Sequence, residues 1–82
     1  MAKVNIYSTP TCTFCVMAKE FFSNNEIEFE EFDVAVDEEK RKEMIEKTGQ
    51  MGVPVIVFIK EDGSEEVVIG FDEAKVKEIL GL

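Results

Sequence analysis

The chain has 82 residues, of which 45% are hydrophobic and 33% charged, and we expect one small globular domain spanning residues 1–82. Nine Lys and Arg stand against eighteen Asp and Glu, and the net charge of −9 argues against DNA, RNA or an anionic membrane as the main ligand. The chain contains no histidine, which excludes Ser-His and Cys-His catalysis and every metal site that needs a histidine ligand.

The first segment, residues 2–8, predicts a strand in which Val4 and Ile6 share one face. It is too short for the apolar core of a signal peptide, and the longest apolar run, residues 53–59, is far below the ~20 residues that span a bilayer. We therefore expect a cytoplasmic protein, and in that compartment a Cys-x-x-Cys pair is more often redox-active or metal-binding than structural.

From Thr13 to Asn24 the apolar residues recur at intervals of three and four, which predicts a helix. The residues expected on one apolar stripe of this helix are Phe14, Met17, Ala18, Phe21 and Phe22. Alternation returns at residues 28–33, which predicts a second strand. A second helix is predicted at residues 37–48, because acidic residues fill its first turn and Gly49 is placed to end it.

The nearly continuous apolar run at residues 53–59 predicts a strand that is buried on both faces. Asp62-Gly63 is a hairpin-turn signal, and residues 65–69 follow as the partner strand. Asp72 can cap a final helix at residues 73–80. The order β-α-β-α-β-β-α, with a right-handed first crossover, predicts an α/β domain with a four-stranded mixed sheet and three flanking helices.

The sequence Cys12-Thr13-Phe14-Cys15 lies where the first strand hands over to the first helix. A thiol in the first turn of a helix faces unpaired N–H groups and the positive end of the helix dipole, which favour the thiolate and lower its pKa. The thiolate is the nucleophile in disulfide exchange, so Cys12 would attack and Cys15, one helical turn deeper, would resolve the mixed disulfide.

Two other interpretations of this pair stay open. The thiols could be buried for packing alone, since cysteine is often a core residue. They could also bind zinc or an iron–sulfur cluster, but such a site needs about four ligands and therefore a dimer that shares its thiolates.

Two further motifs could form a binding site. Proline cannot donate to a ladder, so Pro54 must begin its strand or lie at an edge. If the Val53-Pro54 bond is cis, the Val53 backbone would be exposed beside Cys12 and could pair with an extended substrate backbone; a trans proline at the strand start is the alternative. Asp72 is most simply a helix cap, and Gly70 would let a ligand carboxylate approach the same helix N-terminus.

Residues 7–15 (Tyr-Ser-Thr-Pro-Thr-Cys-Thr-Phe-Cys), 52–54 (Gly-Val-Pro) and 70–73 (Gly-Phe-Asp-Glu) together resemble a glutaredoxin. The resemblance covers essentially the whole chain. It implies the thioredoxin fold with sheet order 2-1-3-4 and a cis bond before Pro54. It also implies reduction of protein disulfides or glutathione mixed disulfides, with Cys12 as the nucleophile.

The resemblance implies that glutathione is a co-substrate and that no cofactor is tightly bound. The backbone of Val53 would pair with glutathione, the turn at residues 70–72 would hold its γ-glutamyl end, and Gln50 would contact its glycine carboxylate. The residues expected to contact glutathione or the target backbone are Thr13, Phe14, Gln50, Val53, Pro54, Gly70, Phe71 and Asp72.

Several positions depart from the family pattern. Thr13 stands where proline is usual between the cysteines, and Thr9 and Pro10 occupy positions that are commonly basic, so a glutathione carboxylate loses one partner. Gly52 replaces a usual threonine, and Ile69 replaces the first of two usual glycines. These changes resemble redoxins that are recharged by thioredoxin reductase instead of glutathione.

We therefore predict a monomeric thiol–disulfide oxidoreductase whose active site ends each turnover as a Cys12–Cys15 disulfide. Lys19 could help to stabilise the Cys12 thiolate, but it lies two turns along the helix from Cys12, so we predict that it is a solvated surface charge. The resemblance implies partners that form a disulfide in each turnover, such as ribonucleotide, peroxide or methionine sulfoxide reductases, with glutathione or thioredoxin reductase as the electron donor. The alternatives are a redoxin recharged by that reductase and a dimeric iron–sulfur or zinc binding module.

Overall fold

The computed structural model describes residues 3–50 and 52–81, and within these ranges seven elements follow the predicted order. They are β1 (Lys3–Ser8), α1 (Thr13–Asn24), β2 (Glu30–Asp33), α2 (Glu38–Thr48), β3 (Val55–Ile59), β4 (Glu65–Ile69) and α3 (Glu73–Leu80). No helix within these ranges is both long enough and apolar enough to cross a bilayer.

The bounds predicted for α1, β4 and α3 are confirmed, and the predicted start of the first strand at residue 2 lies outside the described residues. By contrast, β2 and β3 each begin two residues later than predicted. For β2, the parallel pairing with β1 begins only at Asn5 opposite Glu30. For β3, the ladder begins after Pro54, which has no N–H to donate.

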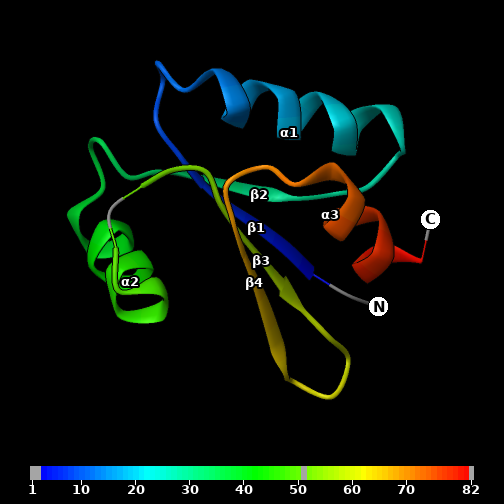
Figure 1. Cartoon of the computed structure of the whole chain (residues 1–82). Coiled ribbons are helices and arrows are strands. Elements are labelled where there is room, and N and C mark those ends of the chain that lie inside the picture. The colour runs from blue at the N-terminus through cyan, green and yellow to red at the C-terminus, as the bar shows by residue number, and fades with distance from the viewer. Residues whose placement is uncertain (1–2, 51, 82) are drawn as a thin grey trace.

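The four strands form one sheet in the order β2-β1-β3-β4, which confirms the predicted topology (Figure 1). β1 and β2 run parallel, while β3 is antiparallel to both β1 and β4. Because β1 and β2 are parallel, their carboxyl ends share one edge of the sheet. The antiparallel register of Tyr7 opposite Val55 brings the start of β3 to the same edge.

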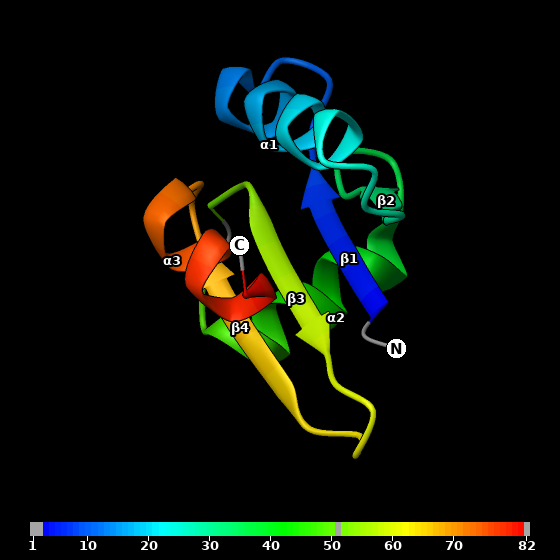
Figure 2. The same ribbon diagram turned by 90° about the vertical axis from the view of Figure 1, so that its right-hand side faces the viewer.

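The sheet is covered by helices on both faces, and Figure 2 shows α3 in front of the strands with α2 behind them. On one face, Ile6 and Ile56 pack with Phe22 of α1 and Val76 of α3. On the other face, Tyr7, Val34, Met44, Val55 and Val57 form a second cluster beneath α2. Successive side chains of a strand point to opposite faces, so β3 supplies both clusters and is buried on both sides as predicted.

The apolar stripe predicted for α1 is only partly correct. Cys15, Ala18 and Phe22 are buried, but Phe14 and Met17 are 58% and 45% exposed. The helix therefore carries two adjacent apolar rows with the same three- and four-residue spacing. The row of Cys15, Ala18 and Phe22 is buried, and of the other row only Phe21 packs against the core.

A polar network attaches α2 to the sheet, where Met44 is the buried residue of the helix. The hydroxyl of the buried Tyr7 donates to Glu43 Oε1 at 2.5 Å. Lys40 Nζ donates to the other Glu43 oxygen at 3.2 Å and lies 4.3 Å from the ring centroid of Phe32. Burial raises the pKa of Tyr7, and the adjacent Glu43 carboxylate raises it further. The same hydrogen bond lowers the pKa of Glu43.

Replacing Tyr7 with Phe keeps the buried ring but removes the hydroxyl that donates to Glu43. We expect the free energy of unfolding at pH 7 to fall by about 1 kcal/mol, the usual net value of one hydrogen bond. The Glu43 pKa is lowered in the folded protein, so the contribution is present at neutral pH and is lost as the pH falls through that lowered pKa.

Urea unfolding of Tyr7→Phe and the parent protein over a series from pH 7 to pH 2.5 measures this difference. The gap between the two proteins should narrow toward the acid end of the series. A gap that is constant with pH would contradict the assigned role of the Tyr7–Glu43 bond.

Candidate active site

Cys12 occupies the N-cap position of α1, directly after the loop that leaves β1. Its backbone is extended, with φ −90° and ψ 110°, and its Sγ accepts a hydrogen bond from the Cys15 N–H at 3.1 Å. At the same position of the other two helices, Asp37 accepts from Lys40 N at 3.1 Å and Asp72 accepts from Lys75 N at 3.2 Å. The sulfur of Cys12 therefore stands where the other helices of the described chain place a carboxylate.

The surroundings of this sulfur favour negative charge. The first turn of α1 consists of Thr13, Phe14 and Cys15, whereas the first turns of α2 and α3 contain glutamates. The unpaired N–H groups and the positive dipole end at the start of α1 are thus left to interact with the Cys12 sulfur. This geometry supports the predicted stabilisation of a Cys12 thiolate.

Cys12 and Cys15 form a disulfide with their Cα atoms 5.2 Å apart. Cys15 is fully buried at 0% exposure, while Cys12 is half-buried at the surface. An external sulfur can therefore meet Cys12 but not Cys15. The difference in exposure agrees with Cys12 as the attacking residue and Cys15 as the resolving residue.

The Val53-Pro54 motif lies at the start of β3, at the end of the sheet where β1 finishes. The peptide bond between the two residues is cis, as the resemblance implied. Pro54 is buried, and its carbonyl accepts a hydrogen bond from Gly70 N at 2.8 Å. Neither the N–H nor the C=O of Val53 has a backbone partner among the described residues.

The bond from Gly70 to Pro54 brings the third motif to the same edge. Gly70 has a left-handed φ of 81°, and a Cβ placed on it would meet no atom within 4 Å. Phe71 is half-buried, with its ring centroid 5.8 Å from that of Phe21 on α1. Asp72 caps α3, which confirms its predicted structural role. The structure thus brings all three sequence motifs to one end of the sheet.

Of three further predicted contact residues, two lie beside Cys12 and the third, Gln50, has its side chain turned toward Gly52. Thr13 and Phe14 are exposed in the first turn of α1, beside Cys12. Gln50 follows α2, and its side chain lies against Gly52, with its Oε1 atom 3.1 Å from the point where a Gly52 Cβ would stand. The Gln50 Nε2 atom is buried and has no hydrogen-bond partner among the described residues.

The sequence did not predict a polar cluster that lies at the end of β1. Lys19, predicted to be a solvated charge, donates to Glu31 Oε2 at 2.7 Å, and the buried Ser8 hydroxyl donates to the same oxygen at 2.7 Å. The hydrogen bond from Lys19 is the main cause that lowers the pKa of Glu31. The three residues come from α1, β1 and β2, so only the parallel pairing of β1 with β2 could have revealed the cluster.

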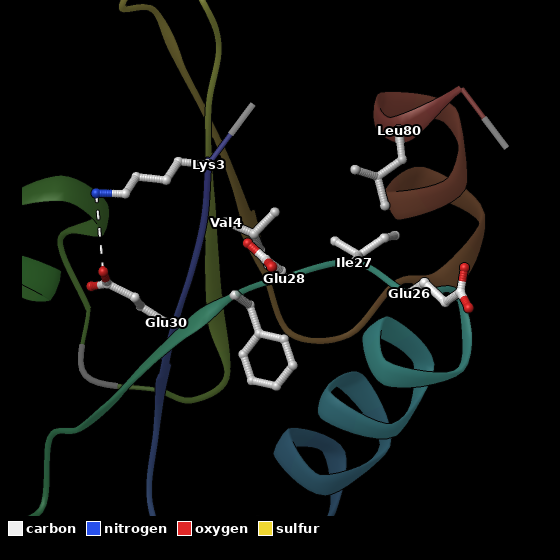
Figure 3. A pocket seen from close by; sticks show the side chains of 8 residues that line it. Lys3, Val4, Glu26, Ile27, Glu28, Glu30 and Leu80 are labelled. Atoms are coloured by element: carbon white, nitrogen blue, oxygen red, sulfur yellow. Dashed lines mark ion pairs between the residues drawn. The ribbon is translucent and has the colours of Figure 1, made fainter. Parts of the chain in front are cut away.

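A pocket lies away from the two cysteines (Figure 3). It has a volume of about 360 Å³, with Val4, Ile27 and Leu80 among its apolar lining residues. Lys3 and Glu30 on its rim form a 4.0 Å ion pair. These residues belong to the starts of β1 and β2, whereas Cys12 follows the end of β1, so the pocket is at the opposite end of the sheet.

Comparison with known proteins identifies relatives over most of the chain. The family model described as Glutaredoxin matches residues 4–62. A glutaredoxin-like 8.6 kDa protein in the rubredoxin operon of Clostridium pasteurianum, itself uncharacterized, is 38% identical, with 94% of this chain and 96% of that protein covered. Glutaredoxin 3 of Escherichia coli K12 is 39% identical over 68% of each chain.

Solved structures agree with this result. The glutaredoxin of Archaeoglobus fulgidus superposes with a TM-score of 0.73 and 33% identity, covering 98% of this chain and 87% of its own. A thioredoxin-like protein superposes with a TM-score of 0.80 and 35% identity, covering 94% of this chain and 99% of its own. The neighbours therefore share the thioredoxin fold and include both glutaredoxins and thioredoxin-like proteins.

The two cysteines of the reduced protein should differ strongly in reactivity. We expect iodoacetamide at pH 7 to alkylate Cys12 at least ~10-fold faster than Cys15, because Cys12 is accessible and its thiolate is stabilised. The variants Cys15→Ser and Cys12→Ser each leave one thiol, so intact mass against time gives each rate separately. Equal rates in the two variants would contradict the assignment of roles.

Proposed function

The chain belongs to the glutaredoxin family, and from this premise we propose that it is a thiol–disulfide oxidoreductase that reduces protein disulfides or glutathione mixed disulfides. The observation that carries the proposal is the position of Cys12, whose sulfur caps the start of α1 while Cys15 lies buried behind it. A buried structural pair would not place one sulfur at the surface against the unpaired N–H groups of a helix.

The reaction follows from these positions in two exchanges. The Cys12 thiolate attacks one sulfur of the target disulfide, which forms a mixed disulfide on Cys12 and releases the other target sulfur as a thiolate that takes up a proton. Cys15 then loses its proton and attacks Cys12 Sγ, which releases the second target thiol and closes the Cys12–Cys15 disulfide. The target gains two electrons, and two electrons from glutathione or a reductase restore the dithiol.

The proposed substrate contacts lie at the end of the sheet where β1 finishes. The N–H and C=O of Val53, which have no backbone partner within the described part of the chain, would pair with the extended backbone of glutathione or of a target segment. Gly70 leaves room for the substrate beside the start of α3, where Asp72 and Phe71 would border its γ-glutamyl end. Phe14 and Thr13 would contact the substrate from the exposed turn next to Cys12.

We place this activity in the cytoplasm, where a reducing environment keeps the dithiol available. The proposed targets are enzymes that form a disulfide in each turnover, such as ribonucleotide, peroxide or methionine sulfoxide reductases. The proposed electron donor is glutathione, with thioredoxin reductase as the second candidate because residues 9 and 10 supply no cation for a glutathione carboxylate.

A coupled NADPH-oxidation assay on a small disulfide tests the proposal and its donor. It is run once with glutathione and glutathione reductase and once with thioredoxin reductase alone. Wild-type protein should turn over with at least one donor, and Cys12→Ser should reduce the rate to background with both. Where glutathione is the donor, Cys15→Ser should lose dithiol reduction but keep deglutathionylation, since that exchange needs Cys12 alone.

Two results of this assay would refute the proposal. One is a wild-type protein that is inactive with both donors, and the other is a Cys12→Ser protein that retains the wild-type rate. Loss of both activities in Cys15→Ser would instead refute the use of glutathione.

The two proposed roles of Asp72 can be separated by a matched pair of variants. Asp72→Asn keeps a capping acceptor, whereas Asp72→Ala removes it and should cost about 1 kcal/mol of stability. Both variants remove the carboxylate proposed to face the γ-glutamyl amino group, so both should raise KM for a glutathione mixed disulfide by roughly twofold to fivefold. Thermal unfolding and steady-state kinetics measure the two effects. A KM that rises only in Asp72→Ala would show that Asp72 acts as a cap alone.

A further inference from the structure

Large apolar side chains are exposed mainly around the start of α1. Within the described residues, the exposed members of this class are Phe14, Val16, Met17, Val36 and Ile69. Three of these five lie in the first two turns of α1, directly after Cys12, whereas the described parts of α2 and α3 contain none. Exposed apolar surface that gathers beside one site marks a place where another molecule binds.

Two of these side chains belong to a row that runs along α1 away from Cys12. Phe14, Met17 and Phe21 are spaced three and four residues apart, so they share one side of the helix. Phe14 and Met17 are 58% and 45% exposed, and Phe21 packs against the core. The ring of Phe21 in turn contacts that of Phe71, just before α3, so α1 and the start of α3 lie side by side (Figure 1). The apolar surface that begins beside Cys12 therefore continues onto a second element.

A groove between α1 and the start of α3 lies along this row. It has a volume of about 250 Å³, and its apolar lining consists of Met17, Phe21 and Phe71. Pockets that bind small molecules commonly measure ~300–1,000 Å³. The groove therefore suits a single apolar side chain better than a whole small ligand.

Two carboxylates border the groove. They belong to Glu20 of α1 and Glu73 of α3, and none of its described lining residues is a lysine or an arginine. Glu73 lies 3.9 Å from Lys77, and Glu20 forms no ion pair within the described part of the chain. A cation next to the docked apolar side chain would meet complementary charge, whereas an anion would be repelled.

The same charges decide among the candidate occupants. Glutathione is a net anion at neutral pH, so the acidic rim disfavours it. A second copy of the chain carries a net charge of −9, and a symmetric dimer through this groove would bring two acidic rims together. The occupant that fits both the apolar lining and the rim is a segment of a target protein with an apolar residue next to a lysine or an arginine.

The distance from Cys12 limits which target residue can reach the groove. A helix rises ~1.5 Å per residue, so Met17 and Phe21 lie about 8 Å and about 14 Å along the axis of α1 from Cys12. An extended chain advances ~3.3 Å per residue. A side chain about two to four residues from the reacting target cysteine therefore reaches the groove.

We propose that the groove between α1 and the start of α3 docks target proteins through an apolar side chain next to a lysine or an arginine, about two to four residues from the cysteine that Cys12 attacks. The inference rests on the proposed attack by Cys12 and names the class of protein disulfide that the site prefers. The residues of the groove position the target and take no part in the exchange itself.

The test follows a single exchange with peptide disulfides. Reduced Cys15→Ser protein is mixed with a symmetric peptide disulfide, and its Cys12 thiolate attacks one sulfur, forms a mixed disulfide and releases the other peptide as a thiolate that takes up a proton. The first peptide has adjacent leucine and lysine about three residues from its cysteine. Two matched peptides have glutamate in place of the lysine, or serine in place of both. Quenched flow with intact mass should show the leucine–lysine peptide reacting at least ~10-fold faster than the serine peptide.

Charge reversal at the rim supplies a sharper comparison. Glu20→Lys should lower the rate with the leucine–lysine peptide roughly threefold to tenfold, and it should raise the rate with the leucine–glutamate peptide by a similar factor. Glu46→Lys is the matched control, because it makes the same change in net charge at an exposed position of α2, on the other face of the sheet. At physiological ionic strength it should change either rate by less than about twofold.

Met17→Ser tests the apolar contact. Because this side chain is partly exposed, its loss should lower the rate with the leucine–lysine peptide roughly twofold to fivefold without unfolding the protein. Bis(2-hydroxyethyl) disulfide is too small to reach the groove, so its rate should stay within about twofold of the parent rate. In amide NMR spectra of the peptide adducts, Met17, Phe21 and Phe71 should shift between the leucine–lysine adduct and the serine adduct.

The outcomes separate the docking groove from the proposed function. If the parent reacts with no disulfide, the attack by Cys12 is refuted, and the docking proposal with it. If the three peptides react at equal rates, or if Glu20→Lys and Glu46→Lys change the rates equally, docking is refuted while the proposed function stands.

Two further results would assign the groove to another occupant and overturn the proposal. One is a rate with glutathione disulfide that equals the leucine–lysine rate and falls equally in Met17→Ser. The other is a reduced parent protein that is a dimer in solution and becomes a monomer in Met17→Ser.

Discussion

The hydrogen bond from the Cys15 N–H to Cys12 Sγ is the contact on which the proposed chemistry of this protein depends. It fixes the sulfur at the N-cap position of α1. At the same position of the other two helices, the capping group is the carboxylate of Asp37 or Asp72. The packing of Ala18 and Phe22 against the sheet holds α1, and with it the sulfur, in position relative to β1. In the proposed mechanism, the Cys12 thiolate is therefore stabilised by the same interaction that caps the helix.

The second face of the sheet contributes indirectly to the same site. α2 has little apolar surface, and the hydrogen bond between Tyr7 and Glu43 compensates by attaching it to β1 through polar contacts. The end of α2 leads directly into Gln50 and Gly52, and then to the cis bond before Pro54. The polar network on this face thus holds the helix that leads into the segment before Pro54. The helix that begins after Cys12 packs on one face of the sheet, and the helix that leads into the Val53-Pro54 motif packs on the other.

The order of the elements could be predicted because each element has a local signal, whereas the sheet order was implied by the family resemblance, and the roles of the two cysteines stay a prediction. Asp72 and Gly49 are examples of such signals, since a cap or a left-handed residue is readable from a few neighbouring positions. The burial of Phe14 was predicted wrongly, because two rows of α1 share the same period and only docking on the sheet decides which row is buried. The ion pair of Lys19 with Glu31 joins residues twelve positions apart and depends on strand pairing. The position of the Gln50 carboxamide depends on a side-chain rotation that no sequence pattern encodes.

The disulfide links two residues only three positions apart, both at the start of one helix. A covalent link this short restricts the unfolded chain less than a link between distant segments, and it joins no two elements of the sheet or its helices. Neither cysteine belongs to either core cluster or forms the Pro54–Gly70 contact. We therefore expect oxidation state and conformational stability to be uncoupled, so that the proposed cycle of electron transfer leaves the scaffold intact.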